Sequence, residues 1–188
     1  MAKKIFRLLQ ARDADDPVIL EEHRSFAARI GVPVEQILRH NCINEPTSAA
    51  LVTRDVDAIL VGGSGRYSVY DQEPWLGDFK STLADLATQQ FPTFASCFGF
   101  QAIVVALGGT VALDSDGAEV GTYTLKLTDD GREDPLFGHL PPSFNVQEGH
   151  KDRAMNLPKE VVNLAQSERC PYQAIRIGKG PVYATQFH

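Results

Sequence analysis

The stretch FASCFGFQ, residues 94–101, marks the point where a short apolar segment ends and a helix begins. Residues 91–96 have the composition of a buried strand, and residues 98–107 form an apolar helical segment that Gly108-Gly109 ends. Cys97 therefore lies at a strand-to-helix turn. A tight turn presents a side chain outward, and the amino terminus of a helix favours a thiolate, so this position suits a reactive sulfur.

Strand and helix patterns alternate along the first half of the chain. Residues 4–9 predict a strand, and the following helix begins near Asp16 and Pro17 and stops at Gly31. The other elements expected in this half are strands over 36–42 and 57–61 and a helix over 77–89. Strands that alternate with helices need crossover connections, so the pattern predicts an α/β fold with a central, mostly parallel sheet.

The second half reads as a smaller antiparallel extension. Residues 120–128 and 144–149 predict strands, and strands over 172–177 and 181–187 flank the hairpin turn at 178–180. No repeat or linker interrupts the chain, and 188 residues suit one domain, so we expect a single domain over residues 1–188.

Composition excludes several classes of protein. Hydrophobic residues at 43% and charged residues at 22% are ordinary for a soluble protein, and no basic run indicates a nucleic-acid partner. The longest apolar run, residues 98–113, is interrupted by polar residues and glycines and is shorter than the ~20 residues of a membrane span. The first residues lack the features of a signal peptide, so we expect a cytoplasmic protein without a membrane partner.

The three cysteines argue against a disulfide framework, because they are odd in number and far apart in the sequence. No CxxC or HExxH pattern is present, so no metal site is expected. An isolated cysteine is more often a small core residue than a nucleophile, and we interpret Cys42 and Cys170 in that way. Cys97 differs in its setting, where Gly99 and Ala95 leave room for a tight turn.

Gly62-Gly63 follows the predicted strand over 57–61 directly. A glycine pair leaves backbone N–H groups unobstructed, so they can face an anion or a developing oxyanion. A simple turn is the alternative interpretation. A phosphate loop is disfavoured, because no Gly-Lys-Ser/Thr follows and the GxGxxG pattern is absent.

A cysteine nucleophile needs a base within hydrogen-bond reach and a third group that orients the base. Two of the five histidines follow predicted strands. His188 ends the apolar segment over 182–187, and His150 has Asp152 nearby. Position in the sequence leaves both histidines open as the base.

Four motifs together resemble one family: Gly62-Gly63, SCFGFQ, GHKD followed by LP, and VYATQFH. In this order, spread over nearly the whole chain, they are similar to the class I glutamine amidotransferases, above all to free-standing members resembling the glutaminase domain of GMP synthase. The resemblance implies a flavodoxin-like three-layer fold. It also implies hydrolysis of the side-chain amide of glutamine, without a cofactor, and delivery of ammonia to an acceptor.

The same resemblance implies four catalytic roles. Cys97 is the nucleophile that forms a γ-glutamyl thioester, and His188 is the base that activates it and later protonates ammonia. The backbone N–H groups of Phe98 and Gly63 form the oxyanion hole.

Four further residues are implied in substrate binding. Gln101 corresponds to the substrate-contacting glutamine after the cysteine, and Gly62 belongs to the same pocket. His150 and Asp152 lie in the segment that in relatives holds the α-amino and α-carboxylate groups of glutamine. Lys151 departs from the small residue usual between them.

Two further departures concern the catalytic machinery. Ala95 replaces the usual glycine two residues before the cysteine. The family motif continues past His188 with Pro-Glu, and that glutamate orients the imidazole. We therefore expect that the sequence is truncated, with part of the carboxyl-terminal region missing, and that a chain ending at His188 has severely reduced glutaminase activity. Sequencing the gene beyond codon 188 tests this expectation.

Several functions remain open at this stage. The first is an amidotransferase whose ammonia acceptor, or synthase, is a partner protein. The others are an amidohydrolase of another γ-glutamyl compound, a non-catalytic binding or regulatory protein with a broken triad, and a cysteine hydrolase or redox-responsive protein that shares only the turn at Cys97.

Overall fold

The computed structural model describes residues 3–188, and most of its strands form one nine-stranded sheet in the order β2-β1-β3-β4-β11-β10-β9-β6-β7. The remaining two strands, β5 and β8, pair with each other. The strands are β1 Phe6–Gln10, β2 Ile37–Asn41, β3 Ala58–Val61, β4 Thr93–Ser96, β5 Thr110–Leu113, β6 Glu119–Leu127, β7 Ser143–His150, β8 Asp152–Asn156, β9 Val161–Gln166, β10 Ala174–Ile177 and β11 Val182–Thr185.

The helices connect the parallel strands, as the alternation in the sequence predicts. They are α1 Val18–Ile30, α2 Ala49–Val52, α3 Pro74–Thr88, α4 Phe98–Ala106 and α5 Asp129–Glu133, with short 3₁₀ turns η1 Val34–Gln36 and η2 Phe137–His139. Helix α1 begins one residue later than expected, at Val18, whose N–H donates to Asp16 Oδ1 over 2.8 Å. Gly31 ends this helix with a φ of 76°, which confirms the predicted stop.

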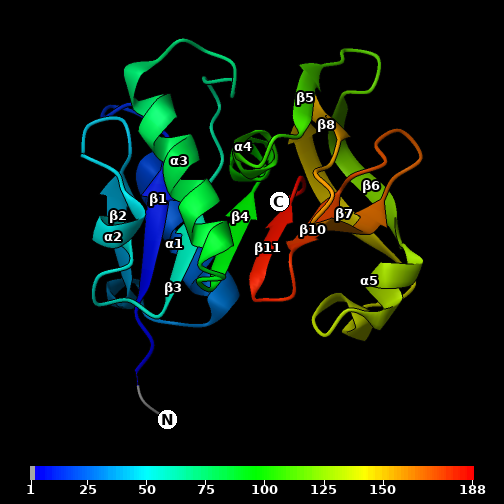
Figure 1. Ribbon diagram of the computed structural model, residues 1–188, viewed down its shortest axis with the longest axis horizontal. Coiled ribbons are helices and arrows are strands. Elements are labelled where there is room, and N and C mark those ends of the chain that lie inside the picture. The colour runs from blue at the N-terminus through cyan, green and yellow to red at the C-terminus, as the bar shows by residue number, and fades with distance from the viewer. Residues whose placement is uncertain (1–2) are drawn as a thin grey trace.

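Three layers are visible in the parallel half (Figure 1). Alternate residues of a strand point to opposite faces, so Leu8 packs with α1 on one face while Leu9 packs with α3 and α4 on the other. Strand β3 repeats the pattern, with Leu60 on the α1 side and Val61 on the opposite side. This confirms the expected flavodoxin-like arrangement of helices on both faces of a parallel sheet.

The second half extends the same sheet with antiparallel strands, in a larger extension than the sequence predicts. Strand β10 runs antiparallel to β11, and β9, β6 and β7 follow in antiparallel pairs. Its apolar core is separate and includes Leu125, Leu164 and Phe137. The sequence patterns did not predict β5, β8 and β9. Strand β8 has the sequence DRAMN, with only two apolar residues, and its pairing with β5 holds it extended.

Strands β4 and β11 place the ends of two distant segments side by side. They pair in parallel, with Thr185 opposite Ser96, although almost ninety residues separate them in the sequence. Figure 1 shows the carboxyl terminus, in red, between the parallel and antiparallel halves. Among the described residues, no helix has the length and apolar character needed to cross a membrane.

Candidate active site

Cys97 occupies a strained turn between β4 and α4. Its backbone φ of 53° and ψ of −103° lie outside the regions that non-glycine residues ordinarily adopt. Its N–H donates to Thr185 O over 2.8 Å, and its carbonyl accepts the first helical bond from Gln101 N–H over 3.1 Å. Such strain costs about 1–3 kcal/mol and persists where surrounding contacts fix the backbone, which is common at functional sites.

Gly99 is required by the close packing of α4 on the sheet. A Cβ at this position would lie 2.7 Å from Val61 Cγ1 and 3.2 Å from Ala95 Cβ. The helix can therefore approach β3 and β4 only without a side chain here. The absence of a Cβ on Gly99 also leaves room for the Ala95 methyl group, which is fully buried. The small residues predicted around the turn thus have a direct steric reason.

The Cys97 thiol is buried at 7% exposure and has two hydrogen-bond donors near its sulfur. The Phe98 N–H is directed at Sγ, and the buried Gln186 amide Nε2 lies 3.8 Å from it. Burial nevertheless raises the pKa of Cys97 to about 11, and the charges of Glu148 and Asp152 act in the same direction. The favourable field expected from the start of α4 is outweighed, so at neutral pH the resting sulfur is a thiol.

His188 follows β11 and lies beside the cysteine turn. Its N–H donates to Gln147 O over 2.9 Å, which ties the end of the chain to β7. A Cβ placed on Gly63 would lie 3.7 Å from His188 Cε1 and 3.8 Å from Cys97 Cβ, so both residues border the same point. Gly149 flanks the other edge of the ring, since a Cβ there would lie 3.7 Å from Nε2. Of the two candidate histidines, His188 is the one beside Cys97.

The Gly62–Gly63 turn directly follows β3, as expected, and a buried carboxylate holds it. Gly63 N–H donates to Glu22 Oε1 over 3.1 Å. A Cβ on Gly62 would lie 2.6 Å from Glu22 Cδ, so only glycine lets the carboxylate approach. Glu22 belongs to α1 and also accepts from Gln10 Nε2 at 2.9 Å and from Arg12 Nη2 at 3.0 Å.

Gln101 and Asp152 lie next to each other near the cysteine turn. Gln101 is buried in the first turn of α4, and its Nε2 donates to Asp152 O at 2.8 Å and to Gln186 Oε1 at 3.2 Å. The Asp152 carboxylate accepts from Ser68 Oγ at 2.9 Å, which links β8 to the loop after Gly63. The amide hydrogens of Gln101 are therefore directed to protein acceptors in this conformation.

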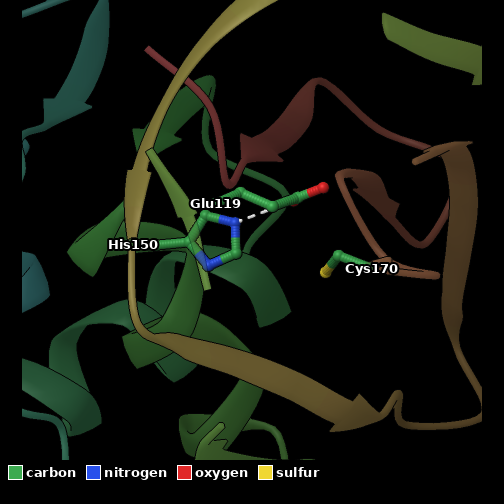
Figure 2. Close-up of side chains that lie close together, drawn as sticks. All are labelled: Glu119, His150 and Cys170. Carbon is green, nitrogen blue, oxygen red and sulfur yellow. Dashed lines mark hydrogen bonds and ion pairs between the residues drawn. The ribbon is translucent and has the colours of Figure 1, made fainter. Parts of the chain in front are cut away.

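His150 lies in a separate buried cluster, drawn in Figure 2. Its Nε2 is 3.1 Å from Glu119 Oε2, and one ligand atom each from Glu119, His150 and Cys170 lie within 4.8 Å of one another. These three residue types can bind a metal ion. In this structure Glu119 is already held by protein donors, with Ser167 Oγ at 2.6 Å and Gln173 Nε2 at 2.5 Å, and the cluster ties β6 and β7 to the loop before β10.

The family model for class-I glutamine amidotransferases matches residues 23–188 of this chain. The chain belongs to the class-I glutamine amidotransferase family. Its fold agrees with a crystal structure of a glutamine amidotransferase from Thermotoga maritima, with a TM-score of 0.75 at 18% sequence identity over 100% of this chain and 76% of that one.

Curated relatives extend the comparison of this amidotransferase. It is 36% identical over 132 residues to a glutamine-hydrolysing GMP synthase of Thermosipho africanus, which covers 70% of this chain but only 23% of that protein. It is 31% identical over 141 residues to a separate subunit of the glutamine-hydrolysing GMP synthase of Methanothermobacter thermautotrophicus, covering 73% of this chain and 67% of that relative. The matched region thus corresponds to about a quarter of the full-length synthase.

Three polar residues at the site of this amidotransferase were missed in the sequence: Glu22, Arg12 and Gln186. A signal existed for Glu22, because it lies three residues after Ile19 and four before Phe26, on the apolar face of the predicted helix. An acid on that face has to find buried partners. Gln186 precedes Phe187 in an otherwise apolar strand segment, and nothing in the sequence indicated that its amide faces Cys97.

Proposed function

We propose that this protein is a glutaminase that releases ammonia from the side-chain amide of glutamine and delivers it to an acceptor. One observation carries the proposal. The strained turn at Cys97 and the ring of His188 border the same point beside Gly63, at the carboxyl ends of adjacent parallel strands. Reactive groups at this edge of a parallel sheet share one crevice.

The first chemical step in the proposal transfers the thiol proton of Cys97 to the imidazole of His188. The sulfur then attacks the amide carbon of glutamine, and the carbon–nitrogen bond breaks as His188 returns the proton to the departing ammonia. Burial lowers the pKa of His188 below its usual value, and His150 and Arg12 add to that lowering while Glu22 opposes it. An imidazole that is neutral at physiological pH is ready to accept the proton.

The second step consumes a water molecule. His188 removes a proton from the water, the oxygen attacks the thioester carbon, and glutamate leaves as the proton returns to the Cys97 sulfur. Because the same histidine serves in both steps, loss of its ring slows formation and hydrolysis of the thioester alike.

The oxyanion of both steps is assigned to the N–H groups of Phe98 and Gly63. The Phe98 N–H already points to the sulfur at the start of α4. The Gly63 N–H donates to Glu22 in this structure, so it exchanges that acceptor for the oxyanion when substrate is bound. Two such donors in a buried site contribute several kcal/mol to the transition state.

Substrate binding is assigned to Gly62, Gln101, His150 and Asp152. Gln101 and Asp152 are linked beside the cysteine turn, which supports a role in shaping the glutamine pocket. His150 acts more indirectly, since its ring bonds to Glu119 and holds the end of β7 near His188.

The ammonia acceptor is assigned to a synthase partner. This proposal rests on the relatives, which include a GMP synthase built from separate subunits. We place the reaction in the cytoplasm, where reducing conditions keep cysteines free. All three cysteines of this chain are free and buried.

The test is ammonia release from glutamine by the purified protein and by its Cys97→Ala variant. We expect Cys97→Ala to reduce release by at least ~10³-fold, because the variant lacks the sulfur that attacks the amide. Removal of a buried sulfur by alanine leaves a small cavity, so circular dichroism should show an intact fold. Cys42→Ala, which removes a buried thiol of β2's end rather than of the turn, is the matched control and should keep the activity.

Equal ammonia release by the Cys97→Ala variant would contradict the assignment of the nucleophile. Hydrolysis of other γ-glutamyl amides in preference to glutamine would favour the amidohydrolase alternative. Glutamine binding with no Cys97-dependent turnover, also in the presence of a synthase partner, would favour the non-catalytic alternative.

A further inference from the structure

Glu22 is a carboxylate buried beside the two reacting residues, and the roles assigned above do not use it. It is 9% exposed, although its neighbour Glu21 on the same helix is exposed to solvent. Three hydrogen bonds define its position. Gln10 Nε2 donates to Oε2, while Arg12 Nη2 and the Gly63 N–H both donate to Oε1.

The carboxylate and the His188 ring both lie against the glycine turn. Gly63 N–H is 3.1 Å from Glu22 Oε1, and the position of a Cβ on the same glycine is 3.7 Å from His188 Cε1. Arg12 Nη2 is 3.9 Å from that same position. The missing side chain of Gly62 lets the carboxylate come this close to the turn. One glycine residue thus separates an acidic side chain from the catalytic imidazole.

Three charged or titratable groups act on the His188 ring from the elements packed around it. Glu22 on α1 favours the protonated ring, while Arg12 before α1 and His150 on β7 disfavour it. Glu22 is the only one of the three that opposes the effect of burial. When the ring accepts the Cys97 proton, it becomes a cation in a buried site, and a cation there needs a compensating charge.

We propose that Glu22 is a positioning residue for the active site: its carboxylate fixes the Gly62–Gly63 turn and supplies the negative charge that stabilises the protonated His188. The inference rests on the assignment of His188 as the base but has a readout that needs no catalysis. Gln10 and Arg12 hold the carboxylate in place, so it acts through its position rather than by contact with substrate.

The test is the titration of the His188 ring, followed by NMR of its Cε1–H in the protein and in three variants. Glu22→Gln keeps the size and the hydrogen-bond acceptor but removes the charge, so the His188 midpoint should move to lower pH. Glu22→Asp keeps the charge and should leave the midpoint nearer to that of the unchanged protein. Glu21→Gln, the neighbouring exposed acid, is the matched control and should have no effect.

Hydrogen exchange of the Gly63 amide tests the structural half of the proposal. Glu22→Ala removes the acceptor of this N–H, so its exchange should accelerate by at least ~10-fold, whereas Glu21→Ala should leave it unchanged. An unmoved His188 midpoint in Glu22→Gln, or an unchanged Gly63 exchange rate in Glu22→Ala, would overturn the inference. Both readouts remain valid if glutamine is not hydrolysed, so failure of the proposed reaction is distinguishable.

If the protein is an active glutaminase, the acidic limb of its kcat/KM profile gives a second view. The neutral ring is the active base, so Glu22→Gln should shift that limb to lower pH in parallel with the NMR midpoint. A limb that stays in place while the NMR midpoint moves would contradict the link between Glu22 and the catalytic base.

Discussion

At the scale of single residues, the site combines groups that would be unstable alone. Cys97 is a buried thiol in a strained backbone conformation, and His188 is an imidazole whose pKa is lowered by burial. Both are neutral at rest, so no buried charge pair has to be maintained before substrate arrives. The proton moves only when the attack on a carbonyl carbon accompanies it, which is the task of a general base.

Glu148 is the residue whose protonation should control stability most directly. It is 5% exposed, neither of its oxygens has a hydrogen-bond partner in the structure, and His150 Nε2 lies 3.5 Å from its Oε2. Burial, together with the charge of Glu119, raises the pKa of Glu148 from 4.5 to about 8. Between these two values the folded protein binds a proton that the unfolded chain releases, so the free energy of unfolding falls as pH rises.

We therefore expect Glu148→Gln to be more stable than the unchanged protein at pH 9, by up to a few kcal/mol at about 1.4 kcal/mol per pKa unit. At pH 4 the two should differ little, because Glu148 is then mostly protonated in both the folded and the unfolded state. Chemical denaturation at the two pH values measures the difference. Glu168→Gln, which changes an exposed acid, is the control, and a stability gap that does not grow with pH would contradict this prediction.

At the scale of elements, the position of the nucleophile depends on the contact of α4 with β3 and β4. Gly99 sets that contact, since any side chain there meets Val61. The residues of the turn are close together in the sequence, so the elbow was predictable from FASCFGFQ alone. The paired strands β5 and β8 were not, because their pairing joins segments about forty residues apart and neither has strong alternation.

Gly99→Ala should move α4 away from the sheet. We expect a loss of about 1–3 kcal/mol in the free energy of unfolding, from overpacking against Val61, together with lower reactivity of Cys97. Gly77→Ala is the matched control, because Gly77 is exposed in α3 with nothing within 4 Å of a new Cβ. That variant should gain about 0.5–1 kcal/mol from helix propensity. Thermal denaturation of both variants measures the contrast, and a Gly99→Ala variant of unchanged stability would show that α4 does not need this close contact.

At the scale of the whole molecule, the site is assembled from both halves of the sheet. The parallel half supplies the turn at Cys97 and the glycine pair, and the antiparallel half supplies Gly149 and the carbonyl of Gln147, which hold His188. The order of motifs was enough to predict the parallel half and to select Cys97 as the candidate nucleophile. The pairing of Glu22 with the glycine turn was not predictable, because it depends on how α1 lies across the sheet rather than on any local pattern.

The central claim, that Cys97 attacks the amide carbon of glutamine, is tested most directly by mass spectrometry of the protein quenched in acid at short times after mixing with glutamine. We predict a γ-glutamyl group on the peptide that contains Cys97, absent from Cys97→Ala and slower to appear in His188→Asn. A γ-glutamyl group on another residue, or ammonia release with no adduct on Cys97 at any time point, would contradict it.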